Sequence, residues 1–122
     1  MGRARILIKR AYDDPAPGDG YRVLVDRVWP RGRSKDALAL DDWAKALAPS
    51  AGLRKWFGHD PKRWKNFQAR YRKELTGQNE LLRSLLKSAG KRPVTLVYGA
   101  KDENHNQAVV LRDMLARMAA HD

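Results

Sequence analysis

A short apolar run, Pro93-Val94-Thr95-Leu96-Val97-Tyr98, lies between two segments of helical periodicity and predicts a buried β-strand. The proline opens the run, where its missing N–H costs a sheet least. Two earlier runs, 5–10 (Arg-Ile-Leu-Ile-Lys-Arg) and 21–26 (Tyr-Arg-Val-Leu-Val-Asp), have the same character, and the turn residues of 13–20 separate them. The sequence therefore predicts at least three strands.

The rest of the chain has mainly helical spacing. Asp60 and Pro61 suit the first positions of a helix that is predicted to run to residue 75, with its apolar residues three or four apart. Similar spacing predicts helices over 80–89 and 104–120. Ser50 is a candidate N-cap for a short helix that ends near residue 57.

Residues 37–48 can be interpreted in two ways. Their Ala and Leu content favours a helix, whereas Pro49 requires an extended residue before it, and a fourth strand would widen a thin sheet. With either interpretation, two strands come first, helices follow, and a further strand precedes the last helix. This order predicts an α/β three-layer sandwich with a mostly parallel sheet of three to four strands.

The composition is that of a small and strongly basic chain. Its 122 residues include 25 Lys and Arg against 14 Asp and Glu, which gives a formal net charge of +11. This length supports one hydrophobic core, so we expect a single domain over residues 1–122. The positive charge favours an anionic partner, and the alternative is that the arginines only cover a solvated surface.

Several classes of protein are excluded. The chain has no Cys, so it has no disulfides, thiolate zinc sites or cysteine-bound iron–sulfur clusters. No apolar run approaches the ~20 residues of a membrane span, and the first residues lack the apolar region of a secretory signal. We therefore expect a cytoplasmic protein with no membrane partner.

Polar residues gather where the predicted strands end, and ligands of open parallel sheets bind at that edge. Asp26 follows the second strand, and His105 opens the last helix, whose free N–H groups favour an anion. Both are candidates for proton transfer if the protein is an enzyme, which the sequence leaves open. The candidate ligand-binding residues are Arg10, Arg27, Arg31, Ser50, Tyr98, Lys101, Asp102 and Asn106. The predicted ligand is a small phosphorylated or carboxylated molecule, and the alternative is a structural ion pair between Asp26 and an arginine.

The helix predicted over 61–75 is a second candidate site. Lys62, Lys65, Arg72 and Lys73 lie on one side of it, which is the charge pattern of a nucleic-acid-binding surface. No helix-turn-helix, zinc-finger or RNP-type motif accompanies them, so a solvated helix face is the alternative. A third possibility is an interaction protein whose basic surface contacts an acidic partner.

Sequence motifs for common cofactors are missing. Gly18-Asp19-Gly20 lacks the third glycine and the following helix of a dinucleotide-binding motif, and there is no phosphate-binding loop or G-x-S-x-G. The three histidines lack metal-ligand spacing. We predict no cofactor and no metal, and the sequence gives no oligomeric state.

Four segments of the chain carry a family resemblance: Leu24-Val25-Asp26-Arg27-Val28-Trp29-Pro30-Arg31-Gly32, Leu47-Ala48-Pro49-Ser50, Leu53-Arg54-Lys55-Trp56-Phe57-Gly58-His59-Asp60, and Leu96-Val97-Tyr98-Gly99-Ala100-Lys101-Asp102 with His105-Asn106. Together they resemble the YeaO-like branch of a bacterial family of unknown function, domain of unknown function 488. The resemblance spans 5–115. It implies a small α/β fold, a cytoplasmic bacterial protein, a strand at 43–48 and no established activity.

The chain departs from the wider family after its last strand. The relatives resemble Cys-x-Glu-Lys-Asp followed by His-Cys-His-Arg. Here Lys101, Asp102 and His105 match that pattern. The family's Cys, Glu, Cys, His and Arg places are occupied by Tyr98, Ala100, Asn106, Gln107 and Ala108. Any thiol or metal chemistry of those relatives is therefore not carried over to this chain.

Overall fold

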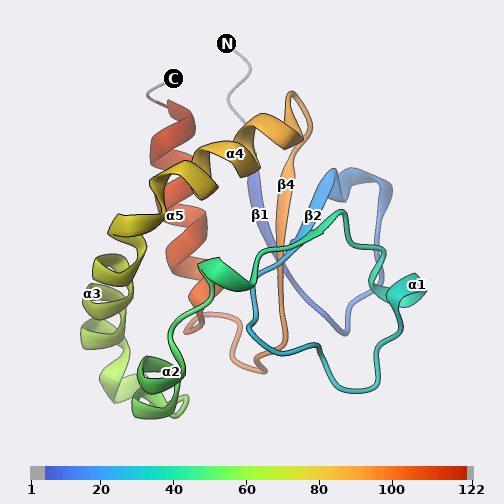
Figure 1. The fold of residues 1–122 in the computed structure, drawn as a ribbon. Coiled ribbons are helices and arrows are strands. Elements are labelled where there is room, and N and C mark those ends of the chain that lie inside the picture. The colour runs from blue at the N-terminus through green and yellow to red at the C-terminus, as the bar shows by residue number, and fades with distance from the viewer. Residues whose placement is uncertain (1–4, 121–122) are drawn as a thin grey trace.

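The computed structural model describes residues 5–120, and the ends of the chain, 1–4 and 121–122, lie outside them. Four strands form one sheet in the order β1-β4-β2-β3, and every pair within it is parallel (Figure 1). The strands are β1 Ile6–Arg10, β2 Tyr21–Leu24, β3 Asp42–Trp43 and β4 Val94–Tyr98. The expected mostly parallel sheet is confirmed, and its carboxyl ends share one edge.

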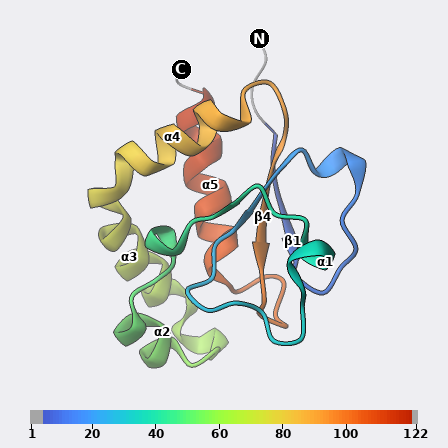
Figure 2. The ribbon, with the colours of Figure 1, turned by 45° about the vertical axis from the view of Figure 1, so that its right-hand side comes forward.

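Helices cover the two faces of this sheet unequally. The helices are α1 Lys35–Leu38, α2 Ala51–Phe57, α3 Trp64–Leu75, α4 Asn79–Ala89 and α5 Gln107–Ala120. Helix α5 packs on β1 and β4, and α3 and α4 pack against α5 on the same side, whereas the one-turn helix α1 lies on the other side of the sheet (Figures 1 and 2). The α/β sandwich therefore has one thick helical layer and one thin layer. No helix within 5–120 is long and apolar enough to cross a membrane.

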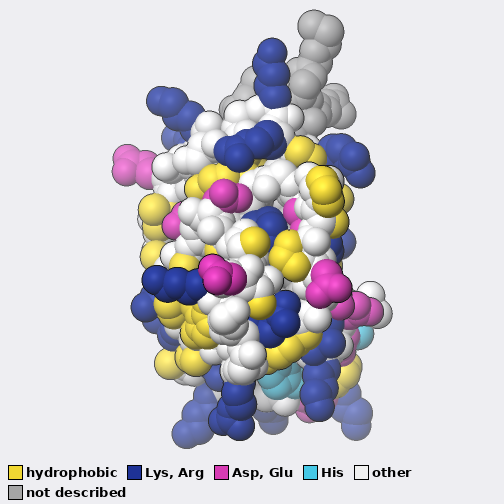
Figure 3. Space-filling model, turned by 90° about the vertical axis from the view of Figure 1, so that its right-hand side faces the viewer, with side chains coloured by type: hydrophobic (Ala, Val, Ile, Leu, Met, Phe, Trp, Pro, Cys, Tyr) yellow, Lys and Arg dark blue, Asp and Glu magenta, His cyan; other side chains and the backbone are white. Residues whose placement is uncertain are grey.

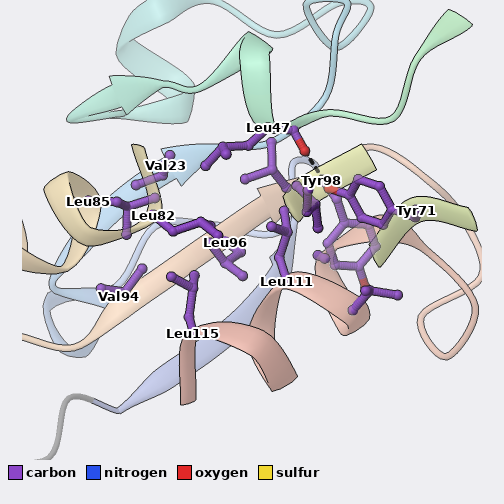
Figure 4. Close-up of a cluster of buried hydrophobic side chains, with 14 of the residues drawn as sticks. Val23, Leu47, Tyr71, Leu82, Leu85, Val94, Leu96, Tyr98, Leu111 and Leu115 are labelled. Atoms are coloured by element: carbon purple, nitrogen blue, oxygen red, sulfur yellow. Dashed lines mark hydrogen bonds between the residues drawn. The ribbon is translucent and has the colours of Figure 1, made fainter. Parts of the chain in front are cut away.

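The main core lies between the sheet and the thick helical layer. Alternate residues of β4 point into it, namely Val94, Leu96 and Tyr98, because side chains along a strand alternate between faces. Figure 4 shows these side chains meeting those of α3, α4 and α5. The Tyr71 hydroxyl donates a hydrogen bond to the Leu47 carbonyl inside this core.

A smaller cluster covers the other face. The buried side chains of Leu24, Leu38 and Val97 form it with Ala11, and Trp29 and Trp43 pack against it. Figure 3 shows this side of the molecule, where Lys and Arg side chains are spread among acidic and hydrophobic ones.

An ionic network lies beside this cluster. The Asp19 carboxylate accepts from Arg22 Nη1 at 2.6 Å and from Lys9 Nζ at 2.9 Å, and Asp19 and Arg22 are both buried. The Thr95 hydroxyl donates to the Asp19 carbonyl. The loop before β2 is thereby held against β1 and β4.

The segment 37–48, left open by its composition, forms neither a long helix nor a strand over 43–48. It contains part of α1, the two-residue strand β3 and a 3₁₀ turn at Lys45–Leu47. The strand expected from the family resemblance at 43–48 is therefore wrong in extent. The 3₁₀ turn ends the sheet pairing and brings Leu47 into the main core.

Two other boundaries differ from the predictions. The second strand ends at Leu24, two residues before the predicted end. The last helix begins at Gln107, because the side chain of Asn106 caps it there. The helices predicted over 61–75 and 80–89 are confirmed, the first of them opening with a 3₁₀ turn at Pro61–Arg63.

Candidate functional site

A cavity of about 200 Å³ opens where β2 and β4 end, next to α2 and the start of α5. Phe57, Phe67, Ala48 and Pro49 contribute its apolar wall. Its charged and ionisable lining residues are Asp26, Arg27, Arg54, His59 and His105. The cavity thus combines an apolar wall with one carboxyl group and four side chains that carry or can accept positive charge.

Asp26 is held in this cavity by two hydrogen bonds. The Gly99 backbone N–H donates to Oδ2 at 2.8 Å, and the Gln107 side-chain amide donates to Oδ1. A Cβ atom at position 99 would lie 2.8 Å from the same Oδ2, so glycine permits this close approach. Asp26 forms no ion pair within the described residues, so the alternative of a structural ion pair with an arginine is wrong.

Burial and the neighbouring groups shift the pKa of Asp26 in opposite directions. Burial raises its pKa from 3.8 to about 6, because a charged carboxylate loses hydration there. The Gly99 N–H, the Arg54 charge, the Gln107 amide and the His59 charge act in the opposite direction. The carboxyl group can therefore hold or release a proton near neutral pH.

Two arginines at the cavity lack an acidic partner. Arg27 donates from Nε and Nη2 to the Pro49 carbonyl, at 3.3 Å each. Arg54 lies on α2 and is exposed. Within residues 5–120, neither guanidinium lies within ion-pair distance of a carboxylate. Guanidinium groups of this kind can bind a carboxylate or a phosphate through paired N–H donors.

His105 is fixed from two sides. Its Nδ1 lies 2.9 Å from Asp102 Oδ2, and its ring meets the Trp64 ring edge-on at 5.3 Å. The Asn104 backbone N–H and the His105 side chain hold the pKa of Asp102 below its usual value. Asp102 therefore orients the imidazole at the cavity but does not itself line the cavity.

The first turn of α5 does not offer the free N–H groups that its sequence predicts. The Asn106 Oδ1 accepts from the N–H groups of Ala108 and Val109, while its Nδ2 donates to the Asp102 carbonyl. An anion in the cavity would therefore depend on side chains, not on the end of this helix.

The structure brings together four of the residues predicted from the strand ends. Asp26, Arg27, His105 and Asn106 line the one cavity, although they come from distant parts of the chain.

The other predicted site residues lie outside the lining. Arg10 donates from Nε to the Ala100 carbonyl at 3.0 Å, and Ser50 caps α2. Tyr98 is buried in the main core, while Arg31 and Lys101 are exposed.

Sequence reasoning missed other lining residues. Arg54 and His59 lie in and after α2 and reach the cavity because α2 packs against α3 beside the sheet edge. The backbone of His59 has a φ of 58°, directly after Gly58. Gln107 follows the predicted Asn106, so the start of the last helix was a signal that could have found it.

The predicted nucleic-acid surface spans α3 and the 3₁₀ turn before it, and its residues differ in exposure. Lys62, Lys65 and Lys73 are exposed, whereas Arg72 is half-buried, and its Nε is buried without a hydrogen-bond partner. The predicted apolar side is confirmed, since Tyr71 is buried. Over the described range, no three His, Cys, Asp or Glu residues are placed to hold a metal ion.

Comparison with known proteins gives the family. Residues 5–122 match the family model described as "Inactive DUF488-N3 subclade". The chain is 44% identical over 110 residues to "Uncharacterized protein YeaO" of Escherichia coli strain K12, which covers 90% of this chain and 96% of the relative. It is 40% identical over 111 residues to "Uncharacterized protein Rv3073c" of Mycobacterium tuberculosis strain H37Rv, which covers 91% and 93%. No solved structure matches the chain significantly. The chain therefore belongs to the DUF488 family, in its YeaO-like branch of uncharacterised bacterial proteins.

Proposed function

We propose that this protein binds a small phosphorylated or carboxylated molecule in the cavity beside Asp26. The observation that carries the proposal is the pair of guanidinium groups, Arg27 and Arg54, at one cavity without a carboxylate partner among residues 5–120. His59 and His105 add further donors to the same lining. Charge-assisted hydrogen bonds from such groups are about twice as strong as neutral ones.

The proposal is binding, with no reaction assigned. Asp26 and His105 are the side chains that could exchange a proton with a bound molecule. The matching family model describes an inactive subclade, and this supports a binding role.

Calorimetric titration with inorganic phosphate and with acetate tests the proposal. We expect saturable binding of at least one anion, and we expect Arg54→Gln to weaken it about tenfold by removing a charged donor. Arg31→Gln is the matched control, because Arg31 is exposed and lies outside the cavity lining. Equal effects of the two substitutions, or no binding of either anion, would contradict the proposal.

Nucleic-acid binding on α3 is the alternative that the same variants can separate. Lys65→Glu places a repulsive charge on the exposed side of that helix and lies outside the cavity lining. The proposal predicts that this change leaves anion binding within about twofold of the original, since exposed charges act weakly over distance. Retention of DNA or RNA at low salt that Lys65→Glu abolishes would instead support the alternative.

A further inference from the structure

The cavity has the size and lining of a site for a ring-sized apolar group. Phe57 and Phe67 stack with their ring centroids 4.3 Å apart and contribute to its wall together with Ala48 and Pro49. Its volume is about 200 Å³. An apolar cavity of roughly 150 Å³ is large enough to hold benzene. One ring with a small substituent therefore fits.

The charged residues of the same cavity determine which substituent the ring of a ligand can carry. Arg27 and Arg54 attract an anionic group, but Asp26 also lines the space that this group would occupy. Two negative charges at one site repel each other unless a proton neutralises one of them. A ligand with a single negative charge and few oxygens suits this arrangement better than a phosphate dianion, whose oxygens would also lose hydration against the phenylalanine wall.

Burial favours the uptake of that proton by Asp26, whereas the groups that face Asp26 stabilise its charged form. Arg54 faces it from α2, His59 from the turn after α2, and Gln107 from α5, while Tyr71 interacts with it from α3. Arg27 and His105 line the same space. Each oxygen of Asp26 already accepts one hydrogen bond, which leaves lone pairs for a shared proton.

We propose that the cavity binds a compact monocarboxylic acid with an apolar, ring-sized body, and that one proton enters with it and lies between its carboxylate and Asp26. This inference rests on the proposed function and narrows its ligand class. No covalent bond changes, and the proton comes from the solvent.

Calorimetry with the full chain tests the ligand class through four probes, namely benzoate, acetate, inorganic phosphate and benzamide. We expect benzoate to bind at least tenfold more tightly than acetate, because only benzoate places a ring on the phenylalanine wall. Benzamide has the same ring without the charge, and we expect it to bind more weakly than benzoate. Equal affinity of benzoate and acetate would overturn the inference.

Proton uptake is measured on the unaltered protein. Benzoate titrations at pH 7 in buffers of different ionisation enthalpy should report the uptake of about one proton. With the pKa of Asp26 at about 6, the protonated fraction falls from about 0.9 at pH 5 to about 0.03 at pH 7.5, so benzoate affinity should fall about 30-fold. Benzoate binding without proton uptake would overturn the inference.

Matched variants assign the proton to a residue. Asp26→Asn should flatten the pH dependence of benzoate binding, whereas His59→Gln and His105→Gln should retain it. A profile flattened by either histidine variant would overturn the assignment to Asp26. If phosphate or acetate binds through Arg54 but benzoate binds no more tightly than acetate, this inference fails and the proposed function stands. If no probe binds, both fail.

Discussion

Asp26 is the residue on which the chemistry of the cavity depends. The sequence places it after a strand, where polar residues of parallel sheets often contact ligands. The structure adds two facts that no sequence pattern indicates, namely its burial and its hydrogen bonds to Gly99 and Gln107. Both arise from contacts between segments more than 70 residues apart, which a single sequence does not specify.

Burial of Asp26 makes stability depend on pH in a defined direction. The pKa of Asp26 is about 6 in the folded chain, against 3.8 for a free aspartate side chain such as that of the unfolded chain. At pH values between these two, the folded state therefore binds more protons than the unfolded state. The stabilisation is complete below pH 3.8 and is lost as pH rises through 6. From pH 4 to pH 7, the wild type should therefore lose up to about 3 kcal/mol of unfolding free energy relative to Asp26→Asn. Urea denaturation of both proteins at each pH measures this difference, and a constant difference would contradict the account.

Tyr71 illustrates the cost of a buried hydroxyl group. It donates to the Leu47 carbonyl in the main core, so Tyr71→Phe leaves that buried carbonyl without its partner. We expect a loss of about 1–2 kcal/mol in unfolding free energy. Tyr12→Phe is the control, because its hydrogen bond to the Arg31 carbonyl is exposed, and it should cost under about 0.5 kcal/mol. Equal losses would contradict this interpretation.

At the scale of elements, local signals predicted the helices better than the short strand. The Asp60-Pro61 pair and the apolar spacing after it give the helix region 61–75 correctly. The extent of β3 was not predictable, because it depends on pairing with β2 and on the burial of Leu47. Composition over 37–48 favours a helix, but tertiary contacts override such propensities.

The start of α5 depends on the side chain of Asn106. This buried residue accepts two backbone N–H bonds from the first turn and donates to the Asp102 carbonyl. Asn106→Ala should cost about 2 kcal/mol in thermal or urea unfolding, because the cap and a buried hydrogen bond are lost together. Asn104→Ala, at an exposed position nearby, should cost under about 0.5 kcal/mol. A loss of less than about 0.5 kcal/mol for Asn106→Ala would show that the cap is dispensable.

At the scale of the whole molecule, the sheet brings distant residues to one edge. That principle predicted Asp26, Arg27, His105 and Asn106 as neighbours, but it also predicted other site residues that lie outside the cavity lining, namely Arg10, Arg31, Tyr98 and Lys101. It was not sufficient for Arg54, because α2 reaches this edge only by packing against α3. The strand ends therefore predicted one side of the cavity, and helix packing, which the sequence does not specify, supplied the other.

The thin layer of the fold depends on the ionic network at Asp19. Asp19→Asn would leave the buried guanidinium of Arg22 and the ammonium of Lys9 without a negative partner. We expect a loss of about 3 kcal/mol in unfolding free energy, since breaking a buried pair is costly. Asp13→Asn, which changes an exposed carboxylate, is the control and should be nearly neutral. A neutral Asp19→Asn would show that the network contributes nothing to stability.

The central claim is that small anions bind beside Asp26, and nuclear magnetic resonance tests it most directly. Titration of ¹⁵N-labelled protein with phosphate and with benzoate would be followed in ¹H–¹⁵N spectra. The account predicts that the largest saturable shifts belong to the Gly99 N–H and the Gln107 side-chain amide, which both contact Asp26. Largest shifts on α3 at Lys65 and Lys73, or no saturable shift with either anion, would contradict it.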